Sequence, residues 1–136
     1  MRRLLTGIAL LGLTVGAPAL ASAQAGLDGL WTNPKRTVIV NLQPCGPAWC
    51  GKVVAASDKA QIDARKGGTT QLIGTEILSG LRPAGSGRYK GRVFMPKRNM
   101  HATATVRTLN SDTLVVTGCL IAGLLCDEQR WSRVGG

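Results

Sequence analysis

Apolar and polar residues alternate along several short segments of the chain, and turn-forming residues separate these segments. Residues 88–95 alternate basic with apolar or small residues, residues 101–108 alternate again, and residues 114–118 follow a compact turn. A period of two is typical of strands with one buried face. The residues that this pattern places on inward faces are Tyr89, Gly91, Val93, Ala102, Ala104, Val106, Leu114, Val116 and Gly118.

Strands are predicted on either side of this region as well, because β-branched and apolar residues recur between turn signals. The further segments are residues 37–42, 51–56, 71–81 and 129–134. One stretch has a different character: Ser57 can cap a short helix around residues 58–66, which Gly67 and Gly68 would end. A solvated loop fits this stretch equally well.

Two tryptophan motifs bracket the strand region, Gly29-Leu30-Trp31 at its start and Trp131-Ser132-Arg133 at its end. About seven or eight short strands without crossover helices favour an all-β fold, a small closed antiparallel barrel. In a closed barrel the first and last strands are neighbours, so Arg133 is predicted to lie over Trp31. We expect Trp31, Trp131 and Arg133 to close the barrel structurally, with about 0.5–2 kcal/mol from the cation–π contact.

The first residues have the character of a targeting segment. Arg2 and Arg3 precede an apolar stretch over residues 4–20, and small residues follow at positions 21–23. Residues 1–23 are therefore predicted to be a cleaved signal peptide, and residues 24–136 a single domain that is periplasmic or secreted. The alternative is a retained membrane helix, although glycines and a proline interrupt the stretch.

The four cysteines form two close pairs, Cys45 with Cys50 and Cys119 with Cys126. Four sulfurs can complete a zinc site in a reducing compartment, but export makes disulfides the stronger interpretation. We expect each cysteine to pair with its near neighbour, because both pairs flank turn-like residues. One bridged loop follows an odd-numbered strand and the other an even-numbered strand. In a meander, such loops lie at opposite ends of the barrel.

The chain is basic, with a formal charge of +10 that becomes +8 without Arg2 and Arg3. Such a charge favours anionic partners such as lipids, lipopolysaccharide or acidic polymers, or it is simply a solubilising surface. Nucleic acid is disfavoured as a partner, because an exported protein is separated from the usual nucleic-acid targets. In addition, Tyr89 and Phe94 are the only stacking groups beside the tryptophans. The sequence specifies no oligomeric state.

No constellation of catalytic residues is evident. His101 is the only histidine, and the sequence specifies neither a nucleophile nor an orienting partner for it. The seven acidic residues fall mostly in turns or at strand edges, and no phosphate-binding glycine loop precedes a helix. We therefore predict a protein that is not an enzyme, with no cofactor and no metal site.

The order and spacing of several motifs resemble an uncharacterised family of exported bacterial proteins, domain of unknown function 2147. The matching elements are Gly29-Leu30-Trp31, Cys45-Gly46 through Cys50-Gly51-Lys52-Val53, Ile77-Leu78-Ser79-Gly80-Leu81, Gly87-Arg88-Tyr89, Gly91-Arg92-Val93-Phe94, Asp112-Thr113-Leu114, Gly118-Cys119-Leu120 and Gln129-Arg130-Trp131-Ser132-Arg133-Val134. The resemblance implies a lipocalin-like barrel and a site for a lipid or other small apolar ligand. It supplies no catalytic residues, and the chain departs from it at the turn between Met95 and His101.

Small residues on the inward faces predict a cavity, lined by Tyr89, Gly91, Val93, Ala102, Ala104, Val106, Leu114 and Val116. The alternative is a flattened, tightly packed barrel. The apolar residues 120–125 either fold over the barrel mouth or form an exposed contact. We expect non-catalytic binding of a small apolar or amphipathic ligand. A structural or interaction protein of the cell envelope, acting through its basic surface and residues 120–125, is the alternative.

Overall fold

The computed structural model describes residues 12–13, 16, 26–120 and 124–135. Most of the predicted signal peptide, residues 1–23, lies outside these described residues. Within them, no helix has both the length and the apolar character needed to span a membrane.

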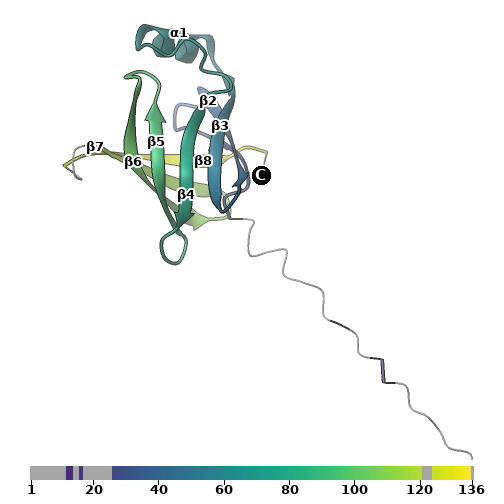
Figure 1. Ribbon diagram of the computed structural model, residues 1–136. Helices are drawn as coiled ribbons and strands as arrows, with labels where there is room; N and C mark the ends of the chain where they lie inside the picture. Colours follow the sequence, from purple (N-terminus) through teal and green to yellow (C-terminus); the bar gives the residue numbers. More distant parts are fainter. Residues whose placement is uncertain (1–11, 14–15, 17–25, 121–123, 136) are drawn as a thin grey trace, which may run out of the picture.

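Eight strands and one helix make up the described domain (Figure 1). Their bounds are β1 Gly29–Thr32, β2 Val38–Cys45, β3 Ala48–Ala56, α1 Asp58–Lys66, β4 Glu76–Pro83, β5 Arg88–Met95, β6 Met100–Asn110, β7 Thr113–Leu120 and β8 Leu125–Arg133. Each strand pairs with the next, and β1 pairs with β8, so the sheet closes into a barrel. The predicted all-β antiparallel barrel is confirmed, with the higher of the two strand counts.

The barrel closes where the two tryptophan motifs meet. Trp31 lies opposite Arg133 and Thr32 opposite Ser132 in the antiparallel pairing of β1 with β8. The backbone N–H of Val134 donates to the carbonyl of Leu30 at 2.8 Å, which extends this contact beyond β8. The pairing is short, and it removes the two free edges that an open sheet would expose.

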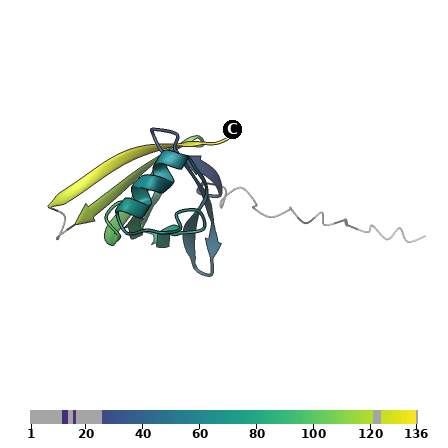
Figure 2. The ribbon, with the colours of Figure 1, turned by 90° about the horizontal axis from the view of Figure 1, so that it is seen from above.

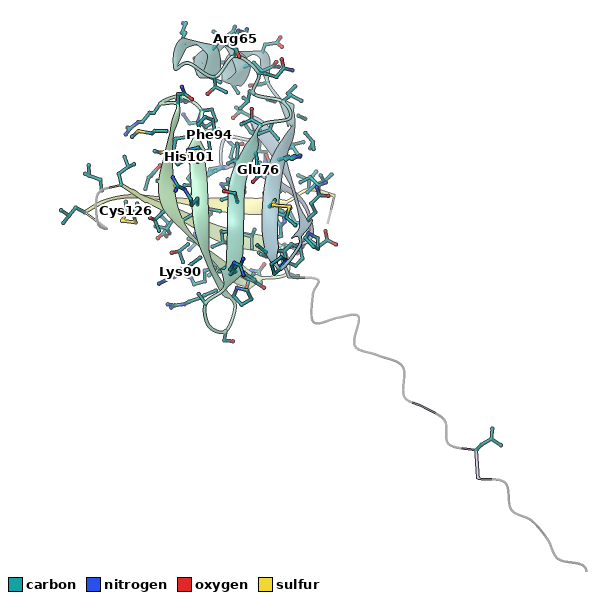
Figure 3. All side chains as sticks on the ribbon, viewed as in Figure 1. Arg65, Glu76, Lys90, Phe94, His101 and Cys126 are labelled. Atoms are coloured by element: carbon teal, nitrogen blue, oxygen red, sulfur yellow. A yellow bond between two sulfur atoms is a disulfide. The ribbon has the colours of Figure 1, made fainter. Side chains whose placement is uncertain are left out.

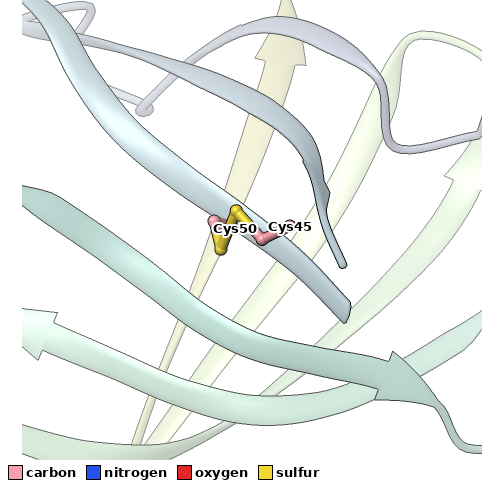
Figure 4. The surroundings of a disulfide bond; sticks show 2 residues. All are labelled: Cys45 and Cys50. Carbon is pink, nitrogen blue, oxygen red and sulfur yellow. A yellow bond between two sulfur atoms is a disulfide. The ribbon is translucent and has the colours of Figure 1, made fainter. Parts of the chain in front are cut away.

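A meander has two ends, and the two disulfides lie at different ones. The β2–β3, β4–β5 and β6–β7 connections share one end, whereas α1 and the β7–β8 connection belong to the other. Cys45 bonds with Cys50 across the β2–β3 turn (Figure 4), and Cys119 bonds with Cys126 near the β7–β8 tip. The pairing and the opposite placement are those that the sequence favours.

The helix is present where the sequence left a choice between a helix and a loop. Ser57 is its N-cap, and the Ser57 hydroxyl accepts a hydrogen bond from the Ala60 N–H at 3.1 Å. Asp58 lies in the first turn and Arg65 and Lys66 in the last, which suits the helix dipole. Gly67 ends the helix with hydrogen bonds to the carbonyls of Asp63 and Ala64.

Several strands have bounds that differ from those predicted: β2 ends at Cys45 and β3 begins at Ala48, and the differences are larger at β8 and β4. β8 begins at Leu125, four residues before the expected position 129, because Cys119 and Cys126 are directly opposite one another and the hairpin pairing continues to Leu120 and Leu125. β4 begins at Glu76 rather than near residue 71. The preceding residues form a return from α1, in which the Gly74 N–H donates to the Val53 carbonyl.

The core fills the barrel between these ends. Its fully buried side chains include those of Leu27, Trp31, Leu42, Leu78, Leu81, Val106 and Leu114. The half of the β7–β8 hairpin that is nearest its tip does not pack into this core, since residues 124–130 are all exposed. The hairpin projects sideways from the barrel in Figures 1 and 2. One side of the barrel is therefore open at the end that carries α1.

Candidate ligand cavity under the helix

A cavity of about 920 Å³ lies at the α1 end of the barrel. Apolar side chains from several strands and from α1 form most of its lining. They include Val38, Val40, Ala60, Ala64, Leu72, Ile77, Val93, Val116 and Trp131. Such a volume falls near the upper end of the range, about 300–1,000 Å³, that small-molecule sites occupy.

The helix forms the roof of the cavity, and seen from above it crosses the end of the barrel (Figure 2). Ala60 and Ala64 are one helical turn apart and both line the cavity, whereas Ile62 is 43% exposed and does not. Only Ala64 is buried among the helix residues. The roof therefore packs through small side chains and leaves space beneath it.

Contacts with the β5–β6 turn hold the segment that follows the helix. The Thr69 hydroxyl donates to the Pro96 carbonyl at 2.8 Å. Gly67 lies so close to Lys97 that a Cβ atom at this position would collide with the Lys97 backbone. The turn between Met95 and His101 thus helps to position the cavity roof.

The β7–β8 hairpin supplies another wall. Val116, Gly118 and Leu120 of β7 line the cavity together with Asp127 and Gln129, their register partners or near neighbours on β8. Trp131 completes this wall, and its Nε1 donates to Oε1 of Gln129 at 3.1 Å. The exposed half of the hairpin is therefore part of the cavity wall rather than a separate feature.

Charged side chains surround the cavity. Among the described lining residues, four are basic, Lys35, Lys59, Lys97 and Arg98, and two are acidic, Asp63 and Asp127. Lys59 Nζ lies 2.8 Å from Oδ2 of Asp63. That hydrogen bond lowers the pKa of the Asp63 carboxyl, and the charges of Lys59, Lys97 and Lys66 lower it further. Asp63 thus carries its charge beside a lysine that already offsets it.

Only some of the residues that were predicted to line a cavity do so in the structure. Val93 and Val116 do so, together with Gly118. The others do not belong to that lining: Tyr89, Gly91, Ala102, Ala104, Val106 and Leu114. Ala104, Val106 and Leu114 are fully buried in the core. Ala102 borders a smaller hollow of about 280 Å³.

Gly91 shows why its small size does not create space. A Cβ atom there would lie 2.5 Å from the Ser79 carbonyl oxygen and 2.9 Å from Gly80. The β4–β5 register shifts between Ser79 and Arg82, and Gly80 has a φ of 58°. The bulged β4 backbone therefore occupies the space that a larger side chain would need.

The opposite end of the barrel is closed around Trp31, as its predicted contact with Arg133 suggests. The Arg133 guanidinium carbon lies 4.3 Å from the centroid of the Trp31 ring. Arg133 Nε donates to the Ser111 carbonyl at 2.8 Å, and its Nη atoms donate to the carbonyls of Asp28 and Gly26. Trp31 is fully buried, and its Nε1 donates to the Leu27 carbonyl at 2.9 Å.

His101 does not line the cavity, but it contacts the lining residue Phe94 and borders the smaller hollow of about 280 Å³. It is an exposed residue opposite Phe94 in the β5–β6 pairing, and their ring centroids are 5.0 Å apart (Figure 3). Within the described part of the chain, no three histidine, cysteine or acidic side chains gather into a group able to hold a metal ion.

The sequence predicted neither the roof of the cavity nor its mouth, by which we mean the exposed lining residues Lys35, Lys97 and Arg98. Ala60 and Ala64 have the spacing of one helix face, which was the signal available for the roof. No periodicity indicated that Lys35, Lys97 and Arg98 lie beside one cavity, because turns far apart in the chain carry them.

Residues 29–133 match the family described as "Uncharacterized protein conserved in bacteria (DUF2147)". The chain belongs to the DUF2147 family. The match covers the whole barrel, from the first residue of β1 to the last of β8.

A solved structure similar to this DUF2147 barrel is described as "Protein HP1028 from the human pathogen Helicobacter pylori belongs to the lipocalin family". The two share 16% sequence identity, with a TM-score of 0.61 over 80% of this chain and 83% of that one. The likeness shows a lipocalin-like fold. No curated protein matches this chain significantly in sequence.

Proposed function

We propose that this DUF2147 protein binds a small apolar or amphipathic ligand, without catalysis, in the cavity beneath α1. The observation that carries the proposal is the cavity of about 920 Å³, with an apolar lining that α1 roofs. Apolar concavities of this size with a few polar groups are the usual form of a small-molecule site. An eight-stranded barrel is also wide enough to hold one small ligand.

The location of the cavity agrees with such a role. It lies at the end where the β7–β8 hairpin projects outward, while Trp31 and Arg133 close the other end. The lipocalin-like fold of the Helicobacter pylori neighbour supports the same class of function by analogy. We keep the role non-catalytic because His101, the only histidine, lies outside the cavity lining.

The proposal places the protein in the periplasm or outside the cell. Two disulfides at opposite ends of the barrel are compatible with an oxidising compartment. The family is one of bacterial proteins. The character of residues 1–23, a basic start followed by an apolar stretch, supports export of the remaining chain.

A second candidate function is contact with an anionic surface of the cell envelope. Five exposed basic side chains lie on the neighbouring strands β4, β5 and β6: Arg82, Arg88, Lys90, Arg92 and Arg107. Arg88 lies opposite Arg107, and Arg82 opposite Lys90. Like charges in such pairs repel, and in the described part of the chain none of these cations has an ion pair.

Native mass spectrometry separates the two candidates. The chain would be exported from a bacterial host, purified without detergent, and sprayed intact. Ligand binding predicts adducts of constant mass that organic extraction removes. Absence of any adduct, together with retention on vesicles of anionic lipid, would reject the first candidate and favour the second.

A further inference from the structure

We infer that the ligand is an anionic amphiphile, with its chain in the cavity and a carboxylate or phosphate group at the mouth beside Lys35, Lys97 and Arg98. The inference rests on the proposed function, because it names the class of ligand that the same cavity takes. Its basis is the separation of apolar and basic residues within the lining.

Three unneutralised cations border the cavity, from two segments far apart in the chain. Lys35 lies in the β1–β2 connection, and Lys97 and Arg98 lie in the β5–β6 turn. All three are exposed, and none has an ion pair or side-chain hydrogen bond within the described residues. Lys59 differs, since it is bonded to Asp63. The fold thus brings free positive charge to an apolar opening.

The acidic residues of the lining do not cancel this charge. Asp63 is matched by Lys59, and the proximity of Lys97 still lowers the pKa of the Asp63 carboxyl. Asp127 belongs to the β8 wall, where it disfavours an anionic group. An anion is therefore favoured beside the β1–β2 connection and the β5–β6 turn.

The interior of the cavity favours an apolar chain as the second part of the ligand. Val40, Ile77, Val116 and Trp131 are buried residues of the lining, and they present apolar surface. A charged group placed among them would lose its hydration without an opposite charge, which is strongly unfavourable. An acyl chain gains from the same surroundings. Together, the interior and the mouth favour a chain with an anionic end.

Calorimetric titration of the exported protein tests this inference with three probes. Dodecanoate has both the chain and the charge, dodecan-1-ol has the chain alone, and inorganic phosphate has the charge alone. We expect dodecanoate to bind about tenfold more tightly than the alcohol, since each exposed charge contact adds modestly to affinity. Inorganic phosphate should not bind saturably.

Matched variants locate the charge. K97A/R98A should weaken dodecanoate binding by about fivefold to tenfold and leave dodecan-1-ol unchanged, which also shows that the cavity is intact. The control R88A/R107A removes the same charge from the outer face of β5 and β6 and should preserve the preference for dodecanoate.

The outcomes distinguish the inference from the function on which it rests. Equal binding of dodecanoate and dodecan-1-ol would overturn the anionic ligand while leaving the cavity as a binding site. Equal losses in K97A/R98A and R88A/R107A would also overturn it, because charge would then act only at long range. Binding of neither amphiphile would reject the proposed function as well.

Discussion

Arg133 joins three parts of the chain at the closed end of the barrel. Its guanidinium covers Trp31, and its donors reach the Ser111 carbonyl of the β6–β7 turn and the carbonyls of Gly26 and Asp28 before β1. Planar stacking and several directed donors require a guanidinium, which a lysine ammonium does not reproduce. We regard Arg133 as a residue of the fold.

Substitution of Arg133 by alanine should therefore lower the free energy of unfolding by about 2 kcal/mol, since it removes both the cation–π contact and the hydrogen bonds. Urea denaturation of the exported protein measures this loss. Arg130→Ala is the matched control, because Arg130 is an exposed basic residue of the same strand. If both variants unfolded at the same urea concentration as the wild type, the structural role of Arg133 would be rejected.

Single residues also show where sequence interpretation stops. The period of two placed Ala104, Val106 and Leu114 inward, and they are indeed fully buried. The same pattern carried no information on what faces Gly91, which is the backbone of β4 at Ser79 and Gly80. A small inward residue marks either a cavity or a close approach of another strand, and only tertiary structure distinguishes these two cases.

Among the elements, the β7–β8 hairpin belongs both to the barrel sheet and to the wall of the cavity. Gly118 and Gln129 on its two strands line the cavity, and residues 124–130 of β8 and the preceding turn are exposed. Few core contacts stabilise this part of the hairpin, so the Cys119–Cys126 disulfide and the strand pairing hold it in place. The exposed Leu124 and Leu125 lie beyond the bridge, and residues 121–123 fall outside the described part of the chain.

Removal of the bridge in C119S/C126S should increase amide hydrogen exchange in residues 117–120 and 125–129, with little change in β2 and β3. The chain-entropy account gives each bridge about 2 kcal/mol of stability. The control C45S/C50S removes a bridge from the other end and should leave exchange in the β7–β8 hairpin as in the wild type. Unchanged protection of the hairpin in C119S/C126S would show that strand pairing alone fixes this wall.

The order of the strands, and their number to within one, could be predicted from the sequence, because alternation and turn residues are local signals. Ser57 and Gly67 marked the bounds of a helix, but the sequence favoured a solvated loop there equally. The predicted start of β8 was wrong because residues 125–128 are exposed and carry no alternating apolar pattern, so only their pairing with β7 makes them a strand. Local patterns thus predicted the elements better than their bounds.

At the scale of the whole molecule, the barrel is closed at one end and hollow at the other. Leu27 and Trp31 fill the closed end, and α1 roofs the hollow end through Ala60 and Ala64. The candidate site could be predicted only in part, since Val93 and Val116 follow from strand alternation. Its mouth depends on turns that meet through the closure of the barrel.

The most direct test of ligand binding beneath α1 fills the cavity from its roof. The uncharged fluorescent probe N-phenyl-naphthylamine would be titrated into the wild type, A60F and I62F. Ala60 lines the cavity, whereas Ile62 is an exposed residue of the same helix outside the lining. We predict saturable binding to the wild type and I62F, and at least about tenfold weaker binding to A60F, corresponding to a loss of about 1.4 kcal/mol. Equal binding to all three proteins, or none to the wild type, would contradict a ligand site beneath α1.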